Sequence, residues 1–151
     1  MSDDDGFRPP ARLRELTQWQ ISKVATLGAR ITGSRMHSGG RADFAVLAAL
    51  EEYGALSQAE LGRRLGLDRN DVNGVINRLA AAGGLERATD PTDRRRNVIT
   101  MTPAGVGQLE ELLAQADAVQ RELLQGLDHD EQRQLRSLLA KVLASHAPQP
   151  A

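Results

Sequence analysis

The chain has 151 residues and a formal net charge of −1, contains no cysteine, and fits one domain by size. Without cysteine it can have no disulfide framework, no thiolate nucleophile and no Cys/His cluster for structural zinc. The acidic start, the absence of an apolar run approaching about 18 residues and the scattered histidines argue against export, a membrane span and a catalytic or metal centre. We therefore expect a cytoplasmic protein that is not an enzyme and holds no metal or cofactor.

The near-neutral total hides an uneven distribution of charge. Residues 63–96 hold eight arginines against five acidic residues, whereas residues 104–151 hold four basic residues against seven acidic ones. A basic segment in an otherwise acidic protein is typical of a localised DNA contact, although arginines on a solvated helix face give the same pattern. Every basic residue of this segment is an arginine, which favours bidentate contacts with phosphates or bases.

The first third of the chain is predicted to contain two helices after a disordered acidic tail over residues 1–10. Apolar residues recur at helical spacing from Leu13 to Ile31 and again over residues 44–50. The second run ends at Gly54, as expected of a helix with a C-terminal glycine.

A helix-turn-helix is predicted next. Ser57 and Glu60 have the spacing of a capping box, in which each side chain accepts a hydrogen bond from the other residue's backbone N–H and so starts a helix. Gly66 ends this helix, and Asp68 caps the following one, which is predicted over residues 68–82. The apolar stripe of the second helix leaves a polar face opposite it, formed by Arg69, Asn70, Asn73, Gly74 and Asn77.

The periodicity then changes to that of strands. Two short strand-like runs within residues 85–101 flank a polar, turn-rich segment, which predicts a two-stranded β-wing with a charged tip. Two more helices follow, capped at Thr102 and Asp128, before a frayed tail over residues 147–151. This order predicts a mainly α fold, with a winged helix-turn-helix inside a frame of six helices.

Two segments resemble the multiple antibiotic resistance regulator (MarR) family, and the resemblance covers roughly residues 11–146. One is residues 56–65 and the other, more specific, is residues 90–105, where an Asp-x-Arg wing tip leads into a Val-Ile-Thr-Met strand and a capped helix. The resemblance implies that Arg95 enters a DNA minor groove and that Asp93, two residues before it, holds the guanidinium in position. A narrow A·T minor groove attracts arginine through its enhanced negative potential.

The resemblance also implies an intertwined homodimer. Residues 11–35 and 102–146 would supply the dimerisation helices, and residues 41–101 would form the DNA-binding lobe. The apolar helices at both ends favour a partner, although the same leucines could equally form an ordinary core. The predicted interface residues are Leu13, Leu16, Leu109, Leu112, Leu113, Leu123, Leu135, Leu138 and Leu139.

The predicted function is sequence-specific binding of double-stranded DNA at a palindromic operator by a transcriptional regulator, a repressor of its own or a neighbouring promoter. The recognition helix over residues 68–82 would enter the major groove and the wing over residues 85–101 the minor groove. Whether each side chain contacts bases or phosphates stays open. The candidate DNA-binding residues are Arg69, Asn70, Asn73 and Asn77 on the recognition helix, Asp93, Arg94 and Arg95 on the wing, and Ser57, Gln58, Arg64 and Arg78 as phosphate anchors.

Two further hypotheses concern partners. Many members of the resembled family release DNA when a small phenolic or other anionic ligand binds between the dimer helices and the DNA-binding lobe, and Trp19, His37 and Arg41 are candidates for such a site. A tryptophan on an apolar helix is, however, more often part of a core or an interface. The alternative function is a winged-helix protein–protein interaction module without DNA binding, which would not need an arginine-rich wing.

Overall fold

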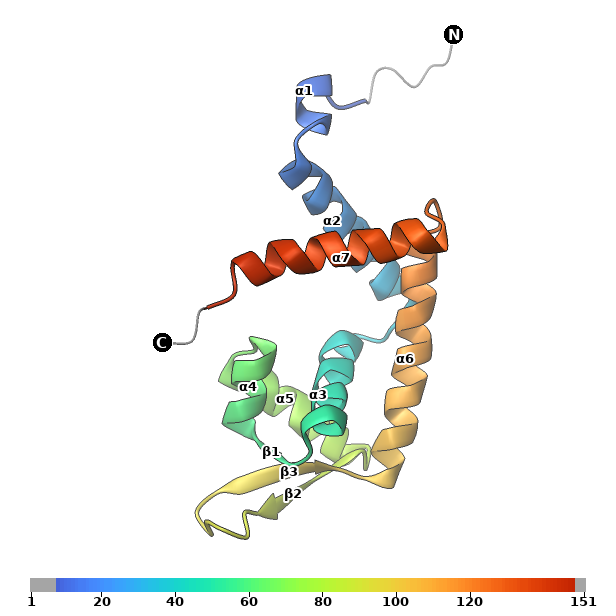
Figure 1. The fold of residues 1–151 in the computed structure, drawn as a ribbon. Helices are drawn as coiled ribbons and strands as arrows, with labels where there is room; N and C mark the ends of the chain where they lie inside the picture. The colour runs from blue at the N-terminus through green and yellow to red at the C-terminus, as the bar shows by residue number, and fades with distance from the viewer. Residues whose placement is uncertain (1–7, 149–151) are drawn as a thin grey trace.

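The computed structural model describes residues 8–148, which form seven helices and one small antiparallel sheet (Figure 1). Most of the tails expected over residues 1–10 and 147–151 lies outside the described residues. The elements in chain order are α1 (Ala11–Arg14), α2 (Thr17–Arg35), α3 (Gly40–Tyr53), β1 (Leu56–Ser57), α4 (Gln58–Leu65), α5 (Arg69–Ala81), β2 (Leu85–Thr89), β3 (Asn97–Met101), α6 (Pro103–Leu123) and α7 (His129–Ser145).

The helix boundaries confirm the predicted caps. The Ser57 hydroxyl accepts a hydrogen bond from the Glu60 backbone N–H at 3.2 Å, and the Glu60 carboxylate accepts one from the Ser57 N–H at 2.7 Å. Thr102 caps α6 through its side chain, and Asp128 forms a second capping box at α7. Gly66 ends α4 with a φ of +64°, in the left-handed region that glycine enters at low cost.

The first predicted helix is wrong in one respect, because it is broken into α1 and α2. Leu16 is extended and precedes the first residue of α2. The next apolar residue of the predicted stripe is Ile21, five positions on, whereas side chains on one helix face recur every three or four residues. The interrupted spacing fits a break at this position.

The wing belongs to a three-stranded sheet, where the sequence predicted only two strands. β3 lies in the middle, with β1 and β2 antiparallel to it on either side. Leu56 of β1 lies opposite Ile99, and Ser57 lies opposite Val98. A strand of two residues has no alternation that could be recognised in a sequence, and it exists only through its pairing with β3.

The core lies in the lobe formed by α3, α4, α5, the sheet and the adjoining part of α6 (Figure 1). Its most deeply buried side chains are Val46, Leu47, Leu61, Val72, Ile76, Leu85 and Ile99. Leu109 and Leu112 of α6 are only 4% and 6% exposed and belong to this core. Leu109 and Leu112, predicted for the dimer interface, therefore lie in the core instead, because α6 packs on α3 as well as on α2.

The helices outside the lobe expose apolar side chains. α6 rises from the foot of the wing, and α7 turns across its far end (Figure 1). Of the other predicted interface residues, Leu123 and Leu135 are half-buried, whereas the exposed ones are Leu13, Leu16, Leu113, Leu138 and Leu139. None of the helices within residues 8–148 is both long enough and apolar enough to cross a membrane.

Candidate nucleic-acid interface

Helix α5 is amphipathic in the way that a recognition helix requires. The Asp68 carboxylate accepts a hydrogen bond from the Asp71 N–H at 2.8 Å and so starts the helix. Its buried residues are Val72, Val75, Ile76 and Leu79, each at most 4% exposed. The opposite face is exposed and consists of the predicted residues Arg69, Asn70, Asn73, Gly74 and Asn77. Apart from its chain neighbours and the surrounding backbone of α5, no atom of the described residues lies within 4 Å of the position that a Cβ at Gly74 would occupy, so this face is open there.

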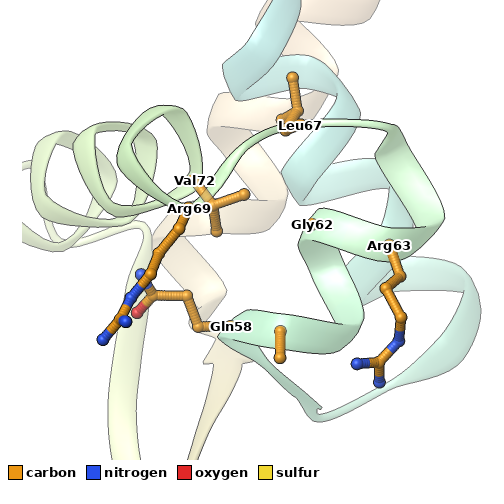
Figure 2. A pocket seen from close by; sticks show the side chains of 7 residues that line it. Gln58, Gly62, Arg63, Leu67, Arg69 and Val72 are labelled. Atoms are coloured by element: carbon orange, nitrogen blue, oxygen red, sulfur yellow. The ribbon is translucent and has the colours of Figure 1, made fainter.

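A cleft of about 510 Å³ lies between α4 and α5, at the turn of the helix-turn-helix (Figure 2). Gln58 and Arg69 point to one side of the cleft and Arg63 lies on the other, while Leu67 and Val72 supply apolar lining. The predicted contact residues Gln58 and Arg69 thus come together from two different helices. With Arg63 they give the cleft hydrogen-bond donors and positive charge.

The wing tip is shaped by two aspartates. The Asp90 carboxylate accepts hydrogen bonds from the Thr92 backbone N–H at 2.9 Å and from its hydroxyl at 2.8 Å, and these bonds hold the pKa of Asp90 below its ordinary value. The Asp93 carboxylate accepts a hydrogen bond from the backbone N–H of Arg95 at 3.0 Å. The sequence predicted that Asp93 would hold the guanidinium of Arg95, but in the structure it holds the backbone, because the two-residue spacing suits this local turn. Arg94 and Arg95 are exposed, and no ion pair within residues 8–148 engages either of them.

Arg96, the third arginine of the tip, joins the wing to the start of α4. Its guanidinium lies 3.0 Å from the Ser57 hydroxyl and 3.1 Å from the Glu60 carboxylate. The hydrogen bonds that Glu60 accepts from the backbone and side chain of Ser57, assisted by the charge of Arg96, lower the pKa of this carboxyl. Ser57, a predicted phosphate anchor, is 6% exposed, and its hydroxyl already has two donors.

Arg78 of α5 binds a buried carboxylate that the sequence did not reveal. Its Nε lies 3.1 Å from Asp43 Oδ1, and its Nη2 makes a second contact with the same carboxylate. Asp43 is 3% exposed and also accepts a bond of 2.9 Å from His37 if the ring nitrogen carries the proton. The hydrogen bonds to Asp43 raise the pKa of Arg78. A phosphate contact by Arg78 stays a prediction, but its guanidinium already neutralises a buried charge.

Two more arginines are held by neighbours from other elements. The guanidinium of Arg64, a predicted phosphate anchor, lies 4.0 Å from the ring centroid of Tyr53, at the end of α3. Arg87 of β2, which the sequence placed in the basic segment without a role, donates a hydrogen bond of 2.5 Å to the Asn77 side-chain carbonyl. Stacking and hydrogen bonding of this kind restrict an arginine to few conformations.

The three predicted effector-site residues do not converge on one site. His37 and Arg41 line a cleft of about 350 Å³ at the turn between α2 and α3. Arg41 also lines a second cleft of about 310 Å³, together with Thr32, Met36, Phe44, Ala116 and Val119. Trp19 lines neither cleft, since it lies near the start of α2, where the Lys23 ammonium is 5.4 Å from its ring centroid.

Comparison with known proteins points to one family. The sequence model of the MarR family matches residues 40–96, from α3 to the wing tip. The multiple antibiotic resistance protein MarR of Salmonella typhimurium is 30% identical over 101 residues, which cover 66% of this chain and 70% of that protein. The transcriptional repressor NicR of Pseudomonas putida is 29% identical over 102 residues, which cover 68% of this chain but only 65%, slightly under two thirds, of NicR.

The same likeness extends to solved structures. The structure of BpsR from Bordetella bronchiseptica, whose DNA binding is regulated by 6-hydroxynicotinic acid, is 29% identical to this chain. The alignment covers 93% of this chain and 100% of the BpsR chain, with a TM-score of 0.76. The similarity therefore includes the helices outside the winged-helix lobe.

Proposed function

The chain belongs to the MarR family, and from this premise we propose that it is a transcriptional regulator that binds double-stranded DNA sequence-specifically. The observation that carries the proposal is the pairing of an exposed polar face on α5 with an arginine-bearing wing on the same lobe. Arg69, Asn70 and Asn73 lie near the start of that face, where a recognition helix meets base edges. Arginine pairs with guanine and asparagine with adenine in the major groove.

The wing supports a second contact, in the minor groove. Arg94 and Arg95 are exposed at its tip, and the bond from Arg95 N–H to Asp93 fixes the backbone that carries them. A guanidinium on such a tip gains most in a narrow A·T groove, because the negative potential is strongest there. We propose that Arg95 enters the minor groove and that Arg94 contacts the neighbouring sugar–phosphate backbone of the DNA.

We further propose that two chains form a homodimer that binds a palindromic operator. Exposed apolar side chains on α2 and α7 support a partner surface, among them Ile21, Val24, Leu138 and Val142, each between 45% and 52% exposed. A dimer would present two recognition helices to half-sites about one helical turn apart.

The proposed action is repression that a small aromatic acid relieves. NicR is named a repressor, and DNA binding by BpsR responds to 6-hydroxynicotinic acid. In this chain the second Arg41 cleft offers one guanidinium among the apolar side chains of Met36, Phe44 and Val119. This combination suits a flat ring that bears a carboxylate or phenolate.

Titration of duplex DNA at several salt concentrations tests the proposal. Each phosphate that the protein neutralises should add about −0.9 to the slope of log K against log salt. A variant with Arg133→Ala on α7, whose side chain pairs with Asp130 outside the lobe, serves as the control and should leave the slope unchanged. Absence of binding, or binding without salt dependence, would favour the protein–protein interaction module instead.

A further inference from the structure

Arg87 is turned toward the recognition helix by the register of the sheet. It lies on β2 directly opposite Ile99 of β3, while Leu85 lies opposite Met101. Opposite residues of an antiparallel pair share a face, and so do residues two apart on one strand. Arg87 therefore shares the face of Leu85 and Ile99, which are 2% and 1% exposed and pack into the core.

The Arg87 side chain emerges where that core ends. Unlike Leu85 it is exposed, and its Nη2 donates to Asn77 Oδ1 across the gap between β2 and α5. Asn77 lies about one helical turn beyond Asn73 on the polar face of α5. Arg87 is thus fixed at the junction of the recognition helix and the wing.

The partner of Arg87 leaves its charge intact. Arg78 and Arg96 are held by the carboxylates of Asp43 and Glu60. No acidic side chain within residues 8–148 forms an ion pair with Arg87, and the amide that holds it is neutral. Of these three arginines, Arg87 alone combines a fixed position with an uncompensated positive charge.

The geometry of DNA indicates a role for Arg87 at this junction, and this role rests on the proposed function. A helix in the major groove and a wing in the adjacent minor groove must straddle the one sugar–phosphate strand that separates the two grooves. In such a complex the junction of α5 and β2 would face that strand. We propose that Arg87 binds a phosphate of this strand, and that Asn77 is the positioning residue that orients its guanidinium.

Asn77 favours binding by ordering Arg87 before DNA arrives. A free arginine loses rotamer freedom when it binds, whereas a guanidinium already held by Asn77 has lost part of that freedom on folding. The donors that Asn77 does not use remain available to phosphate oxygens, which arginine can bind in a bidentate manner. Asn77, predicted from the sequence as a DNA-binding residue, thereby acts through Arg87.

Two duplexes test the proposal: one from the DNA upstream of the gene and one of scrambled sequence with the same composition. Arg87→Ala should weaken binding to both about tenfold, as loss of a hydrogen bond to a charged group predicts, and should lower the salt slope by about one. Arg87→Lys should keep the slope and lose part of the affinity, because it keeps the charge without the fork. Asn77→Ala should weaken both duplexes by less than Arg87→Ala and keep the slope.

The controls separate folding and function from this role. Circular dichroism and urea unfolding check that each variant is folded, and Arg133→Ala should bind like the wild type. If the wild type binds both duplexes and Arg87→Ala changes neither affinity nor slope, the proposal is overturned. A loss confined to one of the two duplexes would also overturn it, since Arg87 would then contact a base. A wild type that binds neither duplex would overturn the proposed function and this inference together.

Discussion

At the scale of residues, the arginines of the lobe differ by what holds them. Arg78 and Arg96 are paired with carboxylates, Arg87 is held by an amide, and Arg94 and Arg95 are exposed at the wing tip. An arginine whose charge is already balanced by a carboxylate contributes less to binding an external anion than an unpaired arginine does. The DNA-binding role is therefore expected to fall unevenly on a segment that looks uniformly basic in sequence.

The wing tip gives the first prediction. Replacing Arg95 by Ala should weaken operator binding by about 1–3 kcal/mol and flatten the preference for A·T base pairs at the flanks. Competition between operators with A·T and with G·C flanks measures both effects, with Arg94→Ala as the matched control that should keep the flank preference. An undiminished preference in Arg95→Ala would contradict minor-groove insertion.

The buried pair gives the second prediction, which concerns stability. Arg78→Ala leaves the Asp43 carboxylate, 3% exposed, without its arginine partner and should lower the free energy of unfolding by about 3 kcal/mol. Asp43→Asn in the same background should restore part of the loss, because it removes the uncompensated charge. Urea unfolding of the single and double variants measures this. A double variant less stable than Arg78→Ala would show that an unpaired Asp43 charge is not the cause of the loss. Separately, the salt slope of DNA binding by Arg78→Ala tests the predicted phosphate contact of Arg78.

At the scale of elements, the sequence predicted what local interactions determine. The capping boxes at Ser57 and Asp128 were visible because a cap and its partner lie three residues apart. The charged wing tip was also visible, because its polar, turn-forming residues follow one another in the sequence.

Interactions between distant segments were not predictable in this way. The Arg78–Asp43 pair joins residues 35 positions apart, and β1 depends on a strand some 40 residues away. Leu109 and Leu112 show the limit of periodicity, because an apolar stripe indicates that a face is covered but not by what. A single sequence contains no signal for the Asn77–Arg87 bond either, since its two residues belong to different elements.

The third prediction concerns the joint between the wing and α6. A Cβ at Gly105 would lie 2.0 Å from the Gly84 carbonyl oxygen, whereas a Cβ at Gly107, on the same helix, would meet nothing within 4 Å. Gly105→Ala should therefore destabilise the protein by about 1–3 kcal/mol, and Gly107→Ala should stabilise it by up to about 1 kcal/mol. Thermal unfolding compares the two. Equal melting temperatures would show that α6 does not need the close approach at Gly105.

At the scale of the whole molecule, α6 connects the lobe that we propose to bind DNA with the helices that we propose to form the dimer. It begins at the foot of the wing, contributes Leu109 and Leu112 to the core of the lobe, and continues to the exposed apolar helices. A dimer formed through those helices would therefore set the spacing between the two copies of α5. This spacing would select operators whose half-sites are about 34–36 Å apart.

The fourth prediction tests the partner surface. Leu138 is 52% exposed on α7, and Ser137 is its neighbour on a different face of the helix. Leu138→Glu should shift the protein from dimer to monomer, because it places a charge in an apolar interface, whereas Ser137→Glu should leave the dimer intact. Sedimentation equilibrium measures the mass. A dimer that tolerates Leu138→Glu would exclude this part of α7 from the interface.

Footprinting of the DNA upstream of the gene tests whether a dimer of this chain recognises a specific sequence. If the chain is a dimeric winged-helix regulator, the protein should protect two half-sites whose centres lie about 10 base pairs, or a multiple of one helical turn, apart. Protection should extend into the flanking minor grooves and shrink there in Arg95→Ala. Uniform coverage without a boundary, or no protection at concentrations that bind scrambled DNA, would contradict sequence-specific recognition by this fold.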